Sequence, residues 1–174
     1  MKRMRIPATT ANMGPGFDCI GMAFDLYNYI SYETVAEEGY CELSSDGDAG
    51  KIDLSKDNLI YRAYCAVFAA LQKPVAGIRM HFENNVPYSR GLGSSSAALI
   101  GGVKVANDVL GNPLDHRALL NIALQFEGHP DNIAPALLGG VVISGLEKDG
   151  TVFYRKITLS SIFFCFRQNI LPKS

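Results

Sequence analysis

The stretch VPYSRGLGSSSAALIGG, Val86 to Gly102, places two glycines and three consecutive serines directly before an apolar run with helical spacing. Residues Arg90 to Ser96 therefore bring unhindered backbone N–H groups to the start of a predicted helix. That end of a helix has unpaired donors and a partial positive charge, so it binds phosphate well. Gly91 and Gly93 permit positive φ and a close approach of the ligand, while the serine hydroxyls can donate to phosphate or coordinate a metal.

This loop differs from the two common nucleotide-binding loops. No Lys-Ser or Lys-Thr follows the last glycine, as a Walker loop requires, and Ser96 stands where GxGxxG has its third glycine. The alternative is a helix capped by serine after a tight glycine turn, which explains one serine and one glycine. Because that alternative leaves the rest of the pattern unexplained, the sequence favours phosphate binding.

The composition limits the classes of partner. The chain has 174 residues, 48% of them hydrophobic and 19% charged, which suits one well-buried core and excludes a disordered chain. A net charge of -1 gives no broad basic field, so we expect a small-molecule partner and neither nucleic acid nor membrane. Four widely spaced cysteines without a CxxC pair indicate reduced thiols, and the N-terminus lacks the apolar core of a signal peptide. These features predict a cytoplasmic protein.

Hydrophobic periodicity predicts both strands and helices. Runs rich in β-branched and aromatic residues predict strands at Tyr27–Val35, Gly77–Phe82, Gly140–Leu146 and Val152–Ile157. Helical spacing predicts one helix from an N-cap at Asp57 to just before Pro74, a second from the serine run to Gly111, and a third from Asp115 to Gly128. The mixed order of these elements, without an internal repeat, predicts an α+β layered domain.

The N-terminal segment PATTANMGPGFD, Pro7 to Asp18, contains two polar side chains that suit a small ligand. Asn12 offers a donor and an acceptor, and Asp18 offers an anionic acceptor. The Gly-Pro-Gly bend between them can turn both side chains towards one molecule, such as an alcohol with an ammonium group. A local loop in which both side chains bond to neighbouring backbone explains the same residues.

A third segment, FEGHPDNIAPALLGG, begins at Phe126. We expect Glu127 at the end of a helix, where the helix dipole disfavours a carboxylate unless a cation such as Mg²⁺ compensates it. Pro130 suits the first position of the next helix, whose start carries further polar residues: His129, Asp131 and Asn132. The alternatives are a solvent-exposed Glu127 and a capping or surface His129.

These segments resemble the GHMP small-molecule kinases. The loop signature of that family, P-x-x-x-G-L-G-S-S-x-A, is matched from Pro87 to Ala97, and Pro7 to Asp18 resembles the opening of its homoserine kinase branch. The resemblance implies a mixed sheet packed against helices, with a left-handed βαβ unit, as in the ribosomal protein S5 domain 2-like fold. It implies an ATP-binding domain over residues 1–157. In residues 158–174 the resemblance fades, and we expect the ferredoxin-like domain that follows in such kinases to be missing.

The resemblance also implies a reaction, the ATP-dependent phosphorylation of L-homoserine to O-phospho-L-homoserine in threonine biosynthesis. The residues that it assigns to ATP are Asn58 with Pro87, Tyr88, Ser89, Arg90, Gly91, Leu92, Gly93, Ser94, Ser95, Ser96 and Ala97. The residues that it assigns to Mg²⁺ are Ser95 and Glu127. Those that it assigns to the L-homoserine pocket are Asn12, Asp18, His129 and Asn132.

For catalysis, the resemblance implies that Asp18 orients the substrate hydroxyl beside Asn132, with the proton leaving late or through solvent. Other branches use an aspartate base near Asp131, which stays an alternative, although a carboxylate of ordinary pKa is a weak base for an alcohol. Two other readings remain: a GHMP kinase for a different small alcohol, and a non-catalytic nucleotide-binding fragment. Without a second domain, we expect weak nucleotide binding, little turnover, and exposed apolar surface that favours a homodimer.

Overall fold

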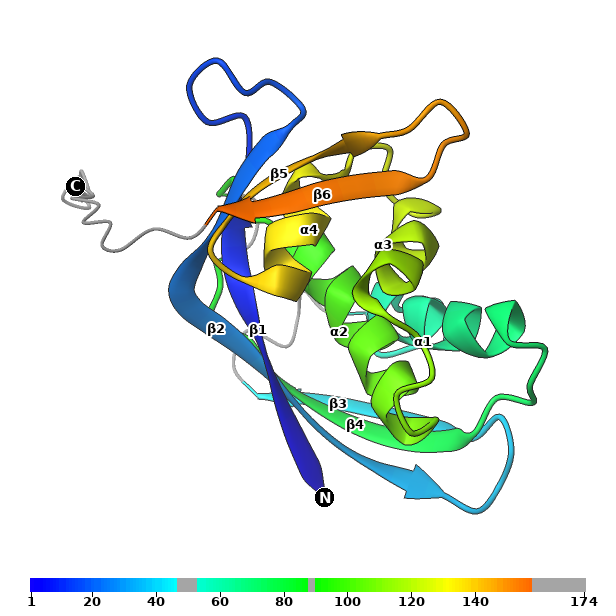
Figure 1. The fold of residues 1–174 in the computed structure, drawn as a ribbon. Coiled ribbons are helices and arrows are strands. Elements are labelled where there is room, and N and C mark those ends of the chain that lie inside the picture. Colours follow the sequence, from blue (N-terminus) through cyan, green and yellow to red (C-terminus); the bar gives the residue numbers. More distant parts are fainter. Residues whose placement is uncertain (47–52, 88–89, 158–174) are drawn as a thin grey trace, which may run out of the picture.

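The computed structural model describes residues 1–46, 53–87 and 90–157, which form a six-stranded sheet and four helices (Figure 1). In chain order the elements are β1 Lys2–Thr10, β2 Ile20–Val35, β3 Cys41–Asp46, α1 Leu59–Ala70, β4 Gly77–Glu83, α2 Ser94–Val109, α3 His116–Leu124, α4 Pro130–Leu138, β5 Val141–Leu146 and β6 Val152–Ile157. None of the helices in these ranges is long and apolar enough to cross a membrane.

The long strand β2 organises the sheet. β1 pairs with β2 over most of its length, while β4 and β5 pair with opposite ends of β2. β3 and β6 extend the sheet beyond β4 and β5. β3 and β4 are parallel and are connected through α1, whereas the other pairs are antiparallel. The mixed sheet confirms the predicted α+β class, and the left-handed sense of the β3–α1–β4 unit stays a prediction.

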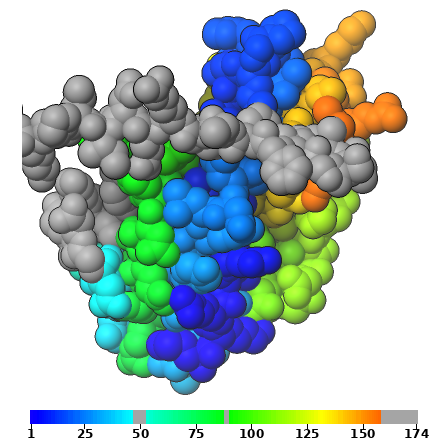
Figure 2. All heavy atoms as spheres, turned by 90° about the vertical axis from the view of Figure 1, so that its left-hand side faces the viewer, coloured from blue at the N-terminus to red at the C-terminus, as the bar shows by residue number. Residues whose placement is uncertain are grey.

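The helices lie together on one side of the sheet (Figure 1), because its strands alternate between apolar and polar residues. In β4, Ile78, Met80 and Phe82 are buried in the shared core, whereas the residues between them are partly exposed. On the opposite face Arg79 pairs with both Glu33 and Glu42. Figure 2 shows this face, on which β1, β2 and β4 lie side by side.

Four strands match the sequence-based predictions, with differences at their ends. β4, β5 and β6 agree within one residue, while β2 begins at Ile20 rather than Tyr27. β1 and β3 were not predicted. β1 contains Pro7 and three charged residues, and its register shifts between Pro7 and Thr9, so it lacks the alternation of a regular strand.

Two helix boundaries differ from the prediction. The N-cap of α1 is Asn58 and not Asp57, because the Asn58 side chain accepts the N–H of Ile60 (2.8 Å). α3 ends at Leu124 and not near Gly128, because the next two N–H groups bond to carbonyls three residues back and tighten the turn. Glu127 therefore lies in the segment between α3 and α4 rather than at a helix end.

Two predictions fall outside the described residues. Tyr88 and Ser89 of the glycine–serine loop lie there, and so does the segment 158–174, for which a divergent sequence is predicted. The predicted domain boundary at residue 157 stays a prediction.

Candidate active site

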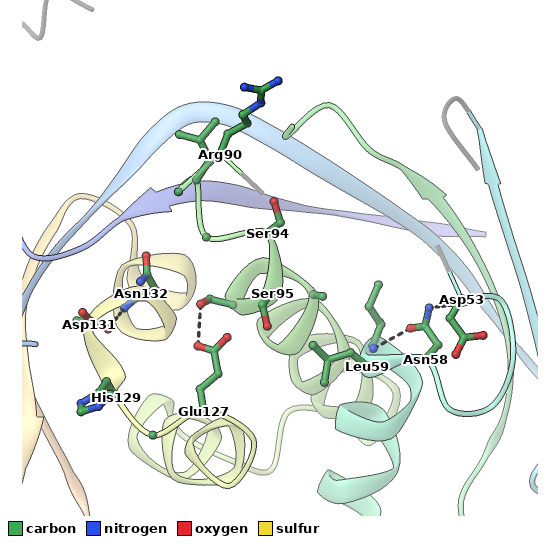
Figure 3. A pocket seen from close by; sticks show the side chains of 17 residues that line it. Asp53, Asn58, Leu59, Arg90, Ser94, Ser95, Glu127, His129, Asp131 and Asn132 are labelled. Carbon is green, nitrogen blue, oxygen red and sulfur yellow. Dashed lines mark hydrogen bonds between the residues drawn. The ribbon is translucent and has the colours of Figure 1, made fainter. Parts of the chain in front are cut away.

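A cavity of about 730 Å³ opens where the N-termini of α1, α2 and α4 meet (Figure 3). Its walls are the glycine–serine loop from Arg90 to Ser96, the segment from Glu127 to Asn132, and the residues that begin α1. Segments that lie far apart in the sequence thus share one opening. This cavity brings together most of the predicted site residues.

The N-terminus of α2 has no side-chain cap. Its N-cap is Gly93, in the left-handed conformation with φ 64° and ψ 32°. The first amide that bonds within the helix is that of Ala97, which donates to the Gly93 carbonyl (2.8 Å). The N–H groups of Ser94, Ser95 and Ser96 consequently have no acceptor in their own helix. The serine-capped helix that the sequence left open is therefore wrong, since the serines lie inside the helix.

The three serine hydroxyls have different partners. Ser94 donates to the Pro87 carbonyl (3.2 Å), and the buried Ser96 donates to Oε2 of Glu127 (2.8 Å). Ser95 is exposed and lines the cavity beside Glu127 (Figure 3). The carboxylate thus bonds directly to Ser96, and Ser95 keeps its hydroxyl available for a ligand.

The sequence predicts Glu127 at the C-terminal end of a helix, where the dipole would require a cation, and this placement is wrong. Since α3 ends at Leu124, the Glu127 carboxylate is not in the last turn of a helix. It lies instead against Ser96 in the first turn of α2, where the helix dipole favours a negative charge. The assignment of Mg²⁺ to Ser95 and Glu127 stays a prediction, supported by two oxygen ligands that line one cavity.

Asn12 and Asp18 have separate roles in the loop between β1 and β2. Both have positive φ, and the Asn12 side chain accepts the backbone N–H of Asp18 (2.7 Å). For Asn12 this bond agrees with the alternative interpretation of a local loop, because it occupies the carbonyl oxygen of the Asn12 side chain. The Asp18 carboxylate instead approaches His129, with Oδ2 3.7 Å from Nδ1. The structure therefore brings Asp18, but not the side-chain oxygen of Asn12, towards the start of α4.

The start of α4 carries one buried carboxylate. His129 is the exposed N-cap, and Pro130 occupies the first helical position, as predicted. Asp131 is only 5% exposed and accepts the N–H of Asn132 (2.9 Å). Burial raises the pKa of the Asp131 carboxyl, and the charge of Asp18 adds to the rise. A raised pKa makes Asp131 a stronger base than an exposed aspartate, so the alternative base remains.

Asn58 lies at the rim of the cavity with both ends of its amide engaged. Its Oδ1 accepts the N–H of Ile60, and its Nδ2 donates to the carbonyl of Asp53. These bonds give Asn58 a sufficient structural role as a helix cap. Its contact with adenine stays a prediction.

Thr9 contacts the site although its sequence position did not indicate a role in it. Its side chain is fully buried next to the cavity, and its hydroxyl donates to Oδ1 of Asn132 (3.0 Å). Its backbone N–H donates to the carbonyl of Leu92 in the glycine–serine loop (3.1 Å). No local sequence pattern indicates this role, because Thr9 lies where the register of β1 shifts and Asn132 is distant in the chain.

Comparisons with known proteins identify the family to which this domain is similar. The family model described as GHMP kinases N terminal domain matches residues 58–140. The homoserine kinase of Carboxydothermus hydrogenoformans is 48% identical over 157 residues, which are 90% of this chain and 51% of that protein. The homoserine kinase of Picosynechococcus sp. is 45% identical over 145 residues, covering 81% and 48%. The chain spans about half the length of these curated relatives.

A solved structure has the same fold. The crystal structure of homoserine kinase from Cytophaga hutchinsonii matches with a TM-score of 0.77 at 27% identity, over 89% of this chain and 51% of that one. The family model also spans both the glycine–serine loop and the segment from Glu127 to Asn132 that form the cavity walls. This chain therefore contains a GHMP kinase N-terminal domain, similar to those of the homoserine kinases.

Proposed function

We propose that this domain is the ATP- and Mg²⁺-binding part of a kinase that phosphorylates the hydroxyl of L-homoserine, giving O-phospho-L-homoserine for threonine biosynthesis, and that the 174-residue chain has little of this activity by itself. The observation that carries the proposal is the uncapped N-terminus of α2, which faces a cavity that also holds Glu127 and the start of α4. Unpaired amides at a helix N-terminus attract phosphate oxygens. The relatives named homoserine kinase support the choice of acceptor.

Phosphate binding is assigned to the backbone of the glycine–serine loop. The amides of Ser94, Ser95 and Ser96 donate to phosphate oxygens, and Arg90 adds a positive charge to the same cavity wall. We assign the wider ATP contact to the whole loop from Pro87 to Ala97 and to Asn58. Phosphoryl transfer requires mainly such positioning and charge stabilisation.

Mg²⁺ suits the ligands that the cavity offers. In the described ranges, no group of three or more His, Cys, Asp or Glu side chains could hold a metal. Mg²⁺ commonly takes one or two protein oxygens and completes its shell with phosphates and water. Ser95 and Glu127 are the residues that would hold it, and it would neutralise charge on the phosphates.

The acceptor pocket is assigned to the residues around the start of α4. We assign Asp18 to orienting the substrate hydroxyl beside Asn132, and His129 and Asn12 to the rest of the pocket. The proton leaves late or through solvent, and Asp131 is the alternative base because its pKa is raised by burial. We expect a cytoplasmic protein without nucleic-acid or membrane partners, and the homodimer also stays a prediction.

Calorimetry of the purified chain with Mg-ATP tests the proposal. We expect binding that weakens about tenfold or more in Ser95→Ala and in Glu127→Ala, by the loss of a metal ligand. Glu147→Ala, which removes an exposed carboxylate in the β5–β6 turn, is the matched control and should bind like the wild type. Unchanged Mg-ATP binding in both Ser95→Ala and Glu127→Ala would contradict the metal assignment. No Mg-ATP binding by the wild type would reject the proposed function.

The choice of acceptor is tested separately. A coupled assay that compares L-homoserine, mevalonate and galactose should show a response to L-homoserine above the other two alcohols. A larger response to mevalonate or galactose would assign the domain to another branch of the GHMP kinases.

A further inference from the structure

Thr9 does not line the cavity but forms hydrogen bonds to two of the segments that do. It lies near the end of β1, just after the register shift that follows Pro7, and it is fully buried. Its backbone N–H donates to the Leu92 carbonyl, and its hydroxyl donates to Oδ1 of Asn132. One residue thus bonds both to the glycine–serine loop and to the first turn of α4.

The hydroxyl of Thr9 also lies against the N-cap of α2. A Cβ built on Gly93 would lie 2.0 Å from Oγ1 of Thr9 and 3.3 Å from Oδ1 of Asn132. Only a glycine leaves room for the threonine hydroxyl at this place. The N-termini of α2 and α4 are therefore packed against one small polar group.

This contact determines which end of the Asn132 amide faces the cavity. An amide side chain can present either its carbonyl oxygen or its NH₂ group to a ligand. Because Oδ1 accepts the Thr9 hydroxyl, the NH₂ group remains for the cavity that Asn132 lines. Asn132 then serves as a donor to oxygens of the acceptor or of the transferred phosphoryl group.

We infer that Thr9 is a positioning residue for the proposed reaction. Its hydroxyl holds the Asn132 amide with the NH₂ group towards the cavity, and it sets the first turn of α4 against the phosphate-binding loop. Thr9 does not line the cavity, so it acts through Asn132. The role rests on the proposed function, since it concerns the alignment of the acceptor with the phosphates.

The direct test is the side-chain NH₂ signal of Asn132 in ¹⁵N–¹H spectra, assigned by its loss in Asn132→Asp. The test variant Thr9→Val removes the Thr9 hydroxyl and keeps the shape of the side chain, whereas Thr9→Ser keeps the hydroxyl. The matched control is Thr10→Val, on the next residue of β1. We expect the signal to move or broaden in Thr9→Val only. An Asn132 signal in Thr9→Val that coincides with that of the wild type overturns the inference.

A Mg-ATP titration separates positioning from simple support of the loop. We expect Thr9→Val to bind Mg-ATP within about threefold of the wild type, because the Thr9 backbone bond to Leu92 survives the substitution. The Mg-ATP-induced shift of the Asn132 signal, present in the wild type and in Thr9→Ser, should be lost. A loss of affinity above about tenfold would assign Thr9 to the phosphate loop alone and overturn the inference. If the wild type binds no Mg-ATP, the proposed function fails, and the spectra without ligand still decide the Thr9–Asn132 contact.

Discussion

The consecutive serines at the start of α2 show how single residues of one type acquire different roles. Ser96 stabilises the Glu127 carboxylate by a partly buried hydrogen bond, while Ser95 is exposed in the cavity. We predict that Ser96→Ala weakens Mg-ATP binding by about threefold to tenfold, because Glu127 loses the donor that orients it. Ser95→Ala should weaken binding more. Calorimetry of both variants decides, and a larger loss in Ser96→Ala would move the metal-ligand role to Ser96.

The buried Asp131 carboxyl makes stability depend on pH. Its pKa is raised in the folded chain, so the folded state binds more protons than the unfolded state between the ordinary aspartate pKa and the raised one. The contribution of Asp131 to stability therefore falls as pH rises through that range. We predict that Asp131→Asn gains stability relative to the wild type as the pH rises above the ordinary aspartate pKa of about 4. Urea denaturation at several pH values tests this, and a constant difference would contradict it.

The sequence predicts which residues form the site better than it predicts their partners. The glycine–serine loop, Glu127 and the start of α4 could be found because they stand together in recognisable motifs. The choice between Ser95 and Ser96 as partner of Glu127 depends on where α2 begins, since adjacent helical residues point about 100° apart. The Thr9–Asn132 bond joins residues far apart in the chain, so no local pattern contains it.

The geometry at the N-terminus of α2 depends on the Gly93 backbone. Gly93 and Gly91 both have positive φ, but a Cβ at Gly91 would meet no atom of the described residues within 4 Å, whereas one at Gly93 would overlap Thr9. We predict that Gly93→Ala lowers the free energy of unfolding by about 3 kcal/mol and abolishes Mg-ATP binding. Gly91→Ala should cost only about 1 kcal/mol for the backbone conformation. Chemical denaturation measures both, and equal losses would contradict the role of the Thr9 contact.

The middle of α2 carries a partly buried lysine, Lys104. Burial lowers the pKa of Lys104, with the charge of Arg5 adding to the effect, and within the described ranges no ion pair includes it. We predict that Lys104→Met raises the free energy of unfolding by about 1 kcal/mol, because it removes a poorly solvated charge. The exposed Lys148→Met is the control and should change stability little. A destabilised Lys104→Met would show that the ammonium group is paired in solution.

At the level of elements, regular strands and capped helices could be predicted and irregular ones could not. β6 and the start of α3 at Asp115 agree with the prediction, because alternation and a side-chain cap are local signals. β1 is held by pairing along β2 despite Pro7, and β3 by parallel pairing with β4. Those partners are distant in sequence, so local propensity underestimates both strands.

At the scale of the whole molecule, the chain spans about half the length of its homoserine kinase relatives. We predict that the 174-residue chain binds Mg-ATP weakly and releases little ADP in response to L-homoserine, because the glycine–serine loop lines the cavity whereas Asn12 and Asp18, which we propose as acceptor residues, do not. A coupled assay for ADP on the purified chain measures this. Robust homoserine-dependent ADP release would contradict the prediction.

The pairing of β2 with strands from both halves of the domain has a consequence for how the chain folds. The end of β2 at Ile20–Met22 pairs with Val141–Ile143, so its final hydrogen bonds form only after the ribosome has made nearly the whole domain. Pairings between distant segments form slowly, and an unpaired strand edge invites aggregation in the meantime. The glycine–serine loop and α2 leave the ribosome earlier, while the strand that closes the sheet is among the last to be synthesised. The nascent chain is therefore most vulnerable to misassembly at the N-terminal end of β2.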